Sequence, residues 1–281
     1  MFGFSFLTRR QGRRRQPQPY RFRPRLEALE GRALPSTLTV TNTLDSGAGS
    51  LRDTIAAAAS GDTIVFAGSV HGQTITLTSG ELAISKSLDI ESPVAHPVHI
   101  SGNNASRVFD ITSSSAAVTL SGLTITDGFS DQGGGIFNAG TLTVSQCTLS
   151  GDSAQLGGAI FNLGTLTTTN STLAGNSAIK GGGIFSKGTL AVSQSTLSDN
   201  SASEAGGGIF SAGTLTISQS TLSGNSADLA GGGIFTSGAL TVNNSTVFGN
   251  SSPSGADLFI LGFASVTIDA NSTVGNIAFA L

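Results

Sequence analysis

From Gly133 onward, apolar and polar residues follow one another in five near-copies of a single segment. The copies begin at Gly133, Gly157, Gly181, Gly206 and Gly231, a period of 24 to 25 residues. Each copy contains three short runs of strand-forming residues, which read GIF, TLTV and TL in the first copy. Period-two alternation predicts strands, and the Gly and Asn residues between the runs predict bends. A fixed period of this length predicts a three-sided solenoid, in which each coil buries its apolar face against its neighbours.

The alternation also predicts which side chains point into the stack. The inward ladders should be Leu142, Leu166, Leu190, Leu215 and Leu240; then Val144, Thr168, Val192, Ile217 and Val242; then Leu149, Leu173, Leu197, Leu222 and Val247. Each buried aliphatic is worth roughly 1.5 to 3 kcal/mol. Cys147 occupies the position where the other copies place a serine, so we interpret it as a small side chain that fills a stacking position.

The pattern divides the chain into four parts. Residues 1–36 are an Arg- and Pro-rich targeting segment with no predicted fold, and residues 37–132 are an N-terminal cap followed by irregular coils. Residues 133–256 are five regular coils of 24–26 residues, and residues 257–281 are a degenerate terminal coil or cap. Ser50 and Asp53 have capping-box spacing, which predicts a short helix that covers the first coil. At the other end, we expect Phe279 and Leu281 to pack against the last ladder.

Charge is distributed unevenly between the N-terminal segment and the body. Nine of the fourteen basic residues are arginines between Arg9 and Arg32, whereas five basic and fifteen acidic residues follow from Ser36 onward. The body therefore has no basic patch with interleaved aromatics, and we predict no nucleic-acid partner. No apolar run approaches the eighteen residues of a membrane helix, so we predict no direct membrane span.

Side chains capable of catalysis are few. The charged residues of the regular coils are Asp152, Lys180, Lys187, Asp199, Glu204 and Asp228. We predict that Asp152 and Asp199 share a solvated bend after the third strand, and that none of these residues forms a catalytic pair. The candidates for catalysis lie earlier: His99, Arg107, Asp110, Asp127 and Asp131. If these five side chains converge in the fold, they indicate an active site. If they are scattered, they are ordinary polar residues of loops. No ligand spacing indicates zinc or calcium, so no metal or cofactor is predicted.

One repeated aromatic position is a candidate binding surface. If the isoleucine of each Ile-Phe pair fills the core, the neighbouring ring must point outward on a regular strand. The candidate ladder is Phe137, Phe161, Phe185, Phe210 and Phe235. An outward ladder would suit a partner protein or a sugar face. The alternative is that the strand kinks after the glycines and buries both residues of each pair.

Three segments resemble known bacterial proteins. The stretch from Val40 to Ile111, with Thr63-Ile64-Val65-Phe66 and Ser101-Gly102-Asn103-Asn104, resembles the first coils of right-handed parallel β-helix proteins. The GGxIF segments and the coil-closing asparagines resemble the GGAI and FxxN motifs of polymorphic outer-membrane protein repeats. Residues 25–36, RLEALEGRALPS, resemble the LEPLEDRLLLS-like sorting motif of planctomycete surface proteins.

These resemblances imply a fold and a place of action. The fold class is all-β: a single-stranded right-handed parallel β-helix of the pectin-lyase-like type, with about ten coils and an N-terminal helical cap. They imply an extracellular, cell-envelope or outer-membrane location, reached through a non-standard N-terminal export segment. Our first interpretation is a non-enzymatic structural or adhesive surface module, with a surface polysaccharide or an envelope protein as partner. The alternative is a polysaccharide lyase or hydrolase with its site before Gly133.

Overall fold

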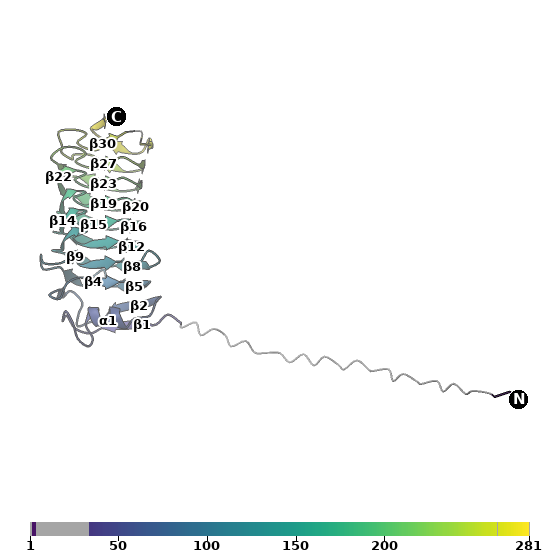
Figure 1. The fold of residues 1–281 in the computed structure, drawn as a ribbon. Coiled ribbons are helices and arrows are strands. Elements are labelled where there is room, and N and C mark those ends of the chain that lie inside the picture. Colours follow the sequence, from purple (N-terminus) through teal and green to yellow (C-terminus); the bar gives the residue numbers. More distant parts are fainter. Residues whose placement is uncertain (1, 4–33, 263, 281) are drawn as a thin grey trace. The chain divides into compact units, whose positions relative to one another are not determined.

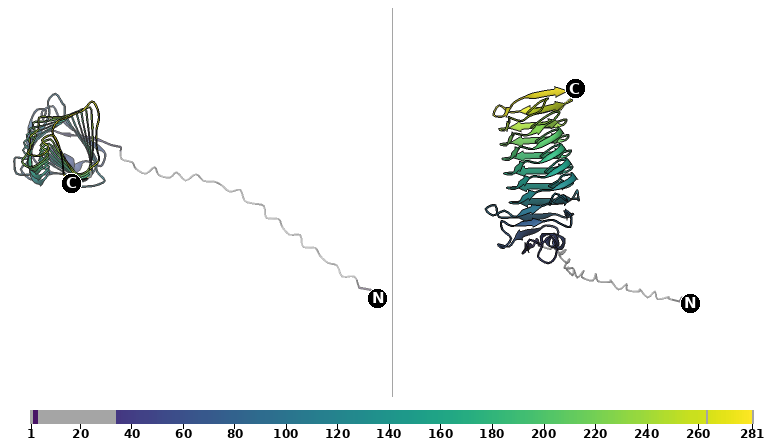
Figure 2. Two further views of the ribbon diagram at one scale, coloured as in Figure 1. Left: turned by 90° about the horizontal axis from the view of Figure 1, so that it is seen from above. Right: turned by 90° about the vertical axis from the view of Figure 1, so that its left-hand side faces the viewer.

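The computed structural model describes residues 2–3, 34–262 and 264–280. From Pro35 onward the chain winds into one column of stacked coils (Figure 1). Viewed along the column, successive coils lie on top of one another (Figure 2). Every strand pair is parallel and joins equivalent strands of neighbouring coils, such as β12 (Thr141–Ser145) and β16 (Thr165–Thr169). The prediction of an all-β, right-handed parallel β-helix of about ten coils is confirmed.

Two of the sheets hold the second and third predicted strands of each coil. Sheet A is formed by β1 (Thr37–Val40), β2 (Asp62–Phe66), β5 (Leu88–Glu91), β8 (Ala117–Ser121), β12, β16, β20 (Thr189–Ser193), β24 (Thr214–Ser218), β28 (Ala239–Asn243) and β31 (Val266–Ile268). Sheet B is formed by β3 (Thr74–Thr76), β6 (His99–Ser101), β9 (Thr124–Thr126), β13 (Thr148–Ser150), β17 (Thr172–Ala174), β21 (Thr196–Ser198), β25 (Thr221–Ser223), β29 (Thr246–Val247) and β32 (Thr273–Val274). Both sheets extend through the irregular coils as well as the regular ones.

The first predicted strand of each coil lies in sheet C. This sheet is formed by β4 (Leu82–Ile84), β7 (Phe109–Ile111), β11 (Ile136–Asn138), β15 (Ile160–Asn162), β19 (Ile184–Ser186), β23 (Ile209–Ser211), β27 (Ile234–Thr236), β30 (Leu258–Leu261) and β33 (Ile277–Ala280). The prediction of three strands per coil is incomplete, because a fourth sheet lies between sheets B and C in chain order. Sheet D is formed by β10 (Phe129–Gln132), β14 (Ser153–Leu156), β18 (Ser177–Lys180), β22 (Ser201–Ala205) and β26 (Ser226–Ala227).

A short helix covers the first coil, as predicted. Helix α1 (Leu51–Ala57) begins after Ser50, whose hydroxyl accepts a hydrogen bond from the Asp53 N–H. A serine in this position satisfies one of the free amides of the first turn. Leu51 and Ile55 then pack into the same core as the strands, and the helix lies at the end of the column opposite the C-terminus (Figure 1).

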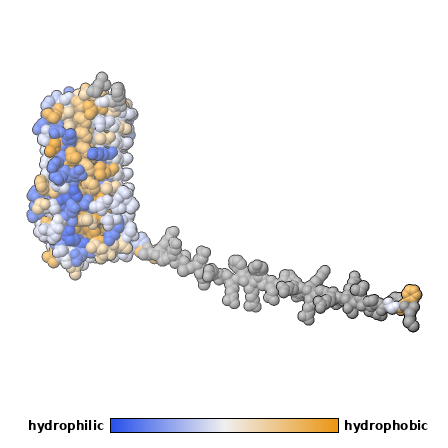
Figure 3. Space-filling model, viewed as in Figure 1, coloured by the Kyte–Doolittle hydropathy of each residue, from blue (hydrophilic) through white to orange (hydrophobic). Residues whose placement is uncertain are grey.

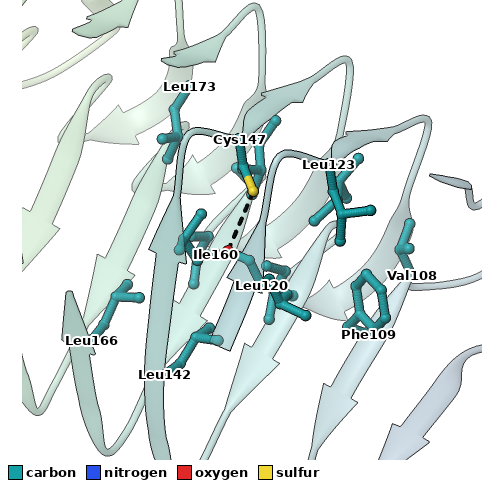
Figure 4. Close-up of a cluster of buried hydrophobic side chains, with 14 of the residues drawn as sticks. Val108, Phe109, Leu120, Leu123, Leu142, Cys147, Ile160, Leu166 and Leu173 are labelled. Carbon is teal, nitrogen blue, oxygen red and sulfur yellow. Dashed lines mark hydrogen bonds between the residues drawn. The ribbon is translucent and has the colours of Figure 1, made fainter. Parts of the chain in front are cut away.

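The interior is filled by the predicted ladders. All fifteen positions named above are buried, including Thr168, whose hydroxyl has no hydrogen-bond partner. Cys147 is also buried, among leucine and isoleucine side chains that include Leu123 and Leu173 (Figure 4). Its Sγ lies 3.4 Å from the Leu120 carbonyl oxygen, which agrees with its interpretation as a filler of a stacking position.

The prediction for the C-terminal end is wrong for Phe279. Strand β33 pairs with β30, which places Phe279 in register with the buried Ile260. Its ring is nevertheless 73% exposed, because none of the described coils lies beyond β33 to cover it. Leu281 lies outside the described residues, as does most of the sorting-like motif.

Candidate functional site

The phenylalanines form a continuous stacked ladder on sheet C. The five predicted members and Phe259 lie in register from β11 to β30. Neighbouring ring centroids are 4.6 to 5.5 Å apart, and neighbouring planes differ by 5 to 14°. We call these six rings the phenylalanine ladder. Phe259 was missed in the sequence, because the Leu-Phe-Ile of β30 lacks the preceding glycine run; the apolar-Phe pair itself was the available signal.

The rings lie outside the core, yet they are not equally exposed. Strands alternate regularly, so Ile136 belongs to the core cluster, Phe137 points away from it, and Asn138 points inward again. Phe161 and Phe185 are only 1% and 4% exposed, whereas Phe137, Phe210 and Phe235 are half-buried. The orientation is therefore outward, as the first alternative has it, but Phe161, Phe185 and, at 9% exposure, Phe259 are covered by other parts of the chain.

Cations lie near the ladder at three places. The Arg107 guanidinium carbon is 5.2 Å from the centroid of the Phe137 ring. The ammonium nitrogens of Lys187 and Lys180 lie 5.9 Å from the Phe185 and Phe210 centroids, respectively. Phe137 has a ladder neighbour on one face only, so its other face can attract the guanidinium. Phe185 and Phe210 have neighbouring rings on both faces, so the two lysines lie near ring edges.

A groove lies at the C-terminal half of the phenylalanine ladder. It has a volume of about 470 Å³ and is lined by Phe210, Phe235 and Phe259, with Leu229 and Leu261 beside them. Leu229 is 60% exposed, so apolar surface faces solvent here. Lys180 and Glu204 form an ion pair with a nitrogen–oxygen distance of 3.2 Å at the rim. On the face that carries sheet C, apolar and hydrophilic surface run side by side along the column (Figure 3).

Two of the five catalytic candidates, Arg107 and Asp110, lie together. Their side chains are 3.4 Å apart, and Glu81 approaches the same guanidinium to 2.8 Å. Arg107 also donates to the Ser130 hydroxyl at 2.9 Å and to the carbonyl oxygens of residues 132 and 133. Burial raises the pKa of Glu81, the charge of Arg107 opposes that rise, and the charge of Asp110 adds to it. The guanidinium is thus held by partners on several sides.

The other three candidates lie on other elements. His99 lies half-buried in β6 of sheet B. Asp127 lies in the bend after β9, where it accepts hydrogen bonds from the hydroxyls of Ser101 and Thr126. Asp131 lies exposed in β10 of sheet D and accepts a 2.7 Å hydrogen bond from Gln155. Within the described ranges, no group of three or more His, Cys, Asp or Glu side chains is arranged to hold a metal ion.

The prediction that Asp152 and Asp199 share a solvated bend is wrong for Asp152. Ser153 pairs with Ser177, which pairs with Ser201, so the residue equivalent to Asp152 is Asn200 and not Asp199. Asp199 is exposed in the bend, whereas Asp152 is fully buried. Burial raises the pKa of Asp152 well above its ordinary value; the Gly128 N–H opposes the rise and the charge of Asp127 adds to it.

Comparison with known proteins supports the fold and nothing finer. No protein-family profile matches the chain, and no curated protein matches it. The crystal structure of pectate lyase Pel9A is similar, with a TM-score of 0.54 and 14% sequence identity over 88% of this chain and 79% of that chain. The chain therefore has a parallel β-helix fold similar to that of pectate lyase. No helix in the described part of the chain is long and apolar enough to cross a membrane.

Proposed function

We propose that this chain is a non-enzymatic, secreted or envelope-associated β-helix that acts as a structural or adhesive surface module. The observation that carries this proposal is the phenylalanine ladder, which turns an apolar stripe away from the core and opens into a groove at Phe210, Phe235 and Phe259. Exposed contiguous apolar surface on a folded protein is typical of an interaction site.

The stacking geometry favours one class of partner. Because the planes differ by no more than 14°, each inner ring has both faces occupied by its neighbours. Only ring edges remain for a ligand, together with Leu229 and Leu261. A sugar ring packs best against an open aromatic face, whereas aliphatic groups pack against edges and methyl groups alike. Apolar side chains of an envelope protein therefore fit the groove better than a polysaccharide does.

The second candidate function is a polysaccharide lyase or hydrolase with its site before Gly133. The fold similar to pectate lyase and the proximity of Arg107 to Asp110 favour it. A lyase needs a base that is free to take a proton and carboxylates that can hold a cation. The Arg107 guanidinium is instead bound to Glu81, Asp110 and Ser130, which favours a structural role.

We further propose an extracellular or cell-envelope location, with export through the Arg-rich segment of residues 1–36. The support is the resemblance of residues 25–36 to a surface-protein sorting motif. Fusing residues 1–36 to a reporter protein and measuring the exported fraction tests this part of the proposal; a reporter retained wholly inside the cell contradicts it.

Retention of the purified chain on coated surfaces tests the contact surface. We expect retention on an octyl-coated surface and less on a polysaccharide-coated one. Phe235→Ser should reduce retention on the octyl surface at least about tenfold, which corresponds to a loss of about 1.4 kcal/mol of contact energy. Phe161→Ser is the matched control, because that ring belongs to the same ladder and is only 1% exposed.

The two variants separate surface loss from destabilisation. Phe161→Ser should lower the free energy of unfolding and leave retention unchanged while the protein stays folded, as checked by circular dichroism. Equal retention of the wild type and Phe235→Ser would remove the support for an apolar contact surface. Retention on polysaccharide alone, lost in Phe235→Ser, would instead indicate a glycan partner.

A further inference from the structure

Buried asparagines form a hydrogen-bonded ladder at the bend between sheets B and D. The members, one per coil, are Asn176, Asn200, Asn225 and Asn250. In each step the Nδ2 of one residue donates to the Oδ1 of the next, at 2.9, 2.8 and 2.8 Å. We call this the asparagine ladder. It has a direction, because every amide donates toward the C-terminal end of the column and accepts from the other side.

Backbone groups fix this direction independently. The Nδ2 of Asn176 also donates to the Leu149 carbonyl at 3.1 Å, and the same contact recurs in the other three coils. The Oδ1 of Asn200 also accepts from the backbone N–H of Asn176 at 3.1 Å. An amide turned around would place its oxygen against a carbonyl oxygen and its NH₂ against an N–H.

Aspartates occupy both ends of the ladder, and they face opposite requirements. At the C-terminal end, Oδ1 of Asp257 accepts from the Asn250 Nδ2 at 2.9 Å and from its backbone N–H at 3.0 Å. Oδ2 of Asp257 accepts from the Asn276 N–H at 2.8 Å. This end needs only acceptors, and an ionised carboxylate supplies nothing else.

Asp152, at the other end, stands where the ladder requires a donor. Its N–H donates to the Asn176 Oδ1 at 3.0 Å, and its own Oδ1 accepts from the Gly128 N–H at 2.8 Å, as in the other coils. The Oδ2 of Asp152 therefore occupies the position that the Nδ2 of asparagine occupies in the other coils. This oxygen is buried, and none of the groups that the structure describes donates a hydrogen bond to it. By register, its neighbours there are the Asn176 Oδ1 and the carbonyl of Ile125, which are both acceptors.

We propose that Asp152 is a neutral carboxylic acid in the folded protein, that its Oδ2–H donates into the asparagine ladder, and that loss of this proton makes the stack pH-sensitive. A protonated carboxyl has the donor and acceptor pattern of an asparagine side chain at these two atoms. The shift of its pKa described above agrees with this assignment. Among the described residues, Asp127, in the bend of the preceding coil, is the charged group that acts on this pKa. Gly128 and Gly135 pack beside the carboxyl, since an added Cβ on either would lie 2.8 to 2.9 Å from its oxygens, and neither glycine carries a charge.

The direction of the pH effect follows from linkage. An unfolded aspartate loses its proton near pH 4, whereas the folded one keeps it until a higher pH. Between these two pKa values the folded state binds one proton more than the unfolded state. The unfolding equilibrium constant should therefore rise by about tenfold per pH unit in this window, so stability falls as pH increases.

Denaturant unfolding of the full chain between pH 4 and pH 9 tests the proposal. Asp152→Asn supplies a donor N–H that does not titrate. This variant should therefore lack the fall in stability between the two pKa values, and it should exceed the wild type in stability at pH 8. Asn200→Asp is the matched control, because it places a carboxyl group inside the ladder. It should add a second pH range in which stability falls as pH increases. Infrared spectra at pH 7 should show a protonated carboxyl C=O band that Asp152→Asn lacks.

Three results would overturn the proposal. The first is a wild-type pH profile that coincides with that of Asp152→Asn. The second is the absence of the protonated carboxyl band from the wild-type spectrum. The third is a gain in wild-type stability on adding CaCl₂ at pH 8 that Asp152→Asn does not share, since this would make Asp152 an ionised cation ligand.

Discussion

At the scale of single residues, one serine hydroxyl per coil accepts a hydrogen bond from a backbone N–H of the preceding coil. The Ser171 hydroxyl accepts from the Cys147 N–H at 3.1 Å, and Ser195, Ser220, Ser245 and Ser272 repeat this contact up the column. Cys147 begins the series, and its thiol needs only to fit and to donate weakly to a carbonyl. Its packing explains why a cysteine is tolerated among serines.

The Cys147 thiol should be unreactive in the native protein. Burial raises its pKa to about 11, with neighbouring backbone groups opposing that rise, so almost no thiolate exists at pH 8. We expect a disulfide reagent such as DTNB to react at pH 8 only after unfolding, with a native rate at least about a hundredfold below that of a free thiol. A native rate within tenfold of the denatured rate would contradict this account of the site.

At the scale of the elements, glycines allow the tight turn from sheet C to sheet A. The series is Gly140, Gly164, Gly188, Gly213 and Gly238. A Cβ on Gly188 would lie 2.0 Å from the Gly164 carbonyl oxygen, and its neighbours in the series are equally confined. Neighbouring coils approach each other too closely here to admit a Cβ atom. Glycine is therefore required at this position for steric reasons.

Gly188→Ala should therefore lower the free energy of unfolding by about 2 kcal/mol or more, because backbone must move to admit the methyl group. Gly68→Ala is the control, since no atom lies within 4 Å of the added Cβ and the backbone there is not left-handed. Denaturant unfolding of both variants measures the difference. Equal stabilities would show that the turn is not confined as described.

Sequence predicted the elements in proportion to the regularity of their pattern. The inward ladders were predictable, because Leu142 and Val144 alternate with threonines as a half-buried strand requires. Sheet D was not, because the short polar–apolar alternation of Ser153-Ala154-Gln155-Leu156 is not kept in its equivalents Phe129–Gln132 and Ser177–Lys180. The position of Asp152 was predicted wrongly for a related reason. Gly151-Asp152 of the first coil is equivalent to Asp199-Asn200 of the third coil, and only the strand register shows this.

At the scale of the whole molecule, the candidate site depends on features that one coil cannot reveal. The same Ile-Phe motif gives a covered ring at Phe161 and a half-buried one at Phe235. Phe235 lines the groove together with Lys180 and Leu229, which come from other parts of the coil, and Phe161 does not. The catalytic candidates illustrate the same limit. Only the fold shows that Arg107 contacts Asp110 and that His99 lies on another sheet.

At the scale of the whole column, the central proposal is a non-enzymatic surface scaffold, supported by the phenylalanine ladder and by the binding of the Arg107 guanidinium to Glu81, Asp110 and Ser130. The most direct test is the release of unsaturated products from polygalacturonate by the purified full chain, assayed from pH 4 to pH 10 with and without calcium. We expect no release above that of buffer. Release proportional to protein concentration, and abolished by Asp131→Asn or Arg107→Ala in folded variants, would contradict it.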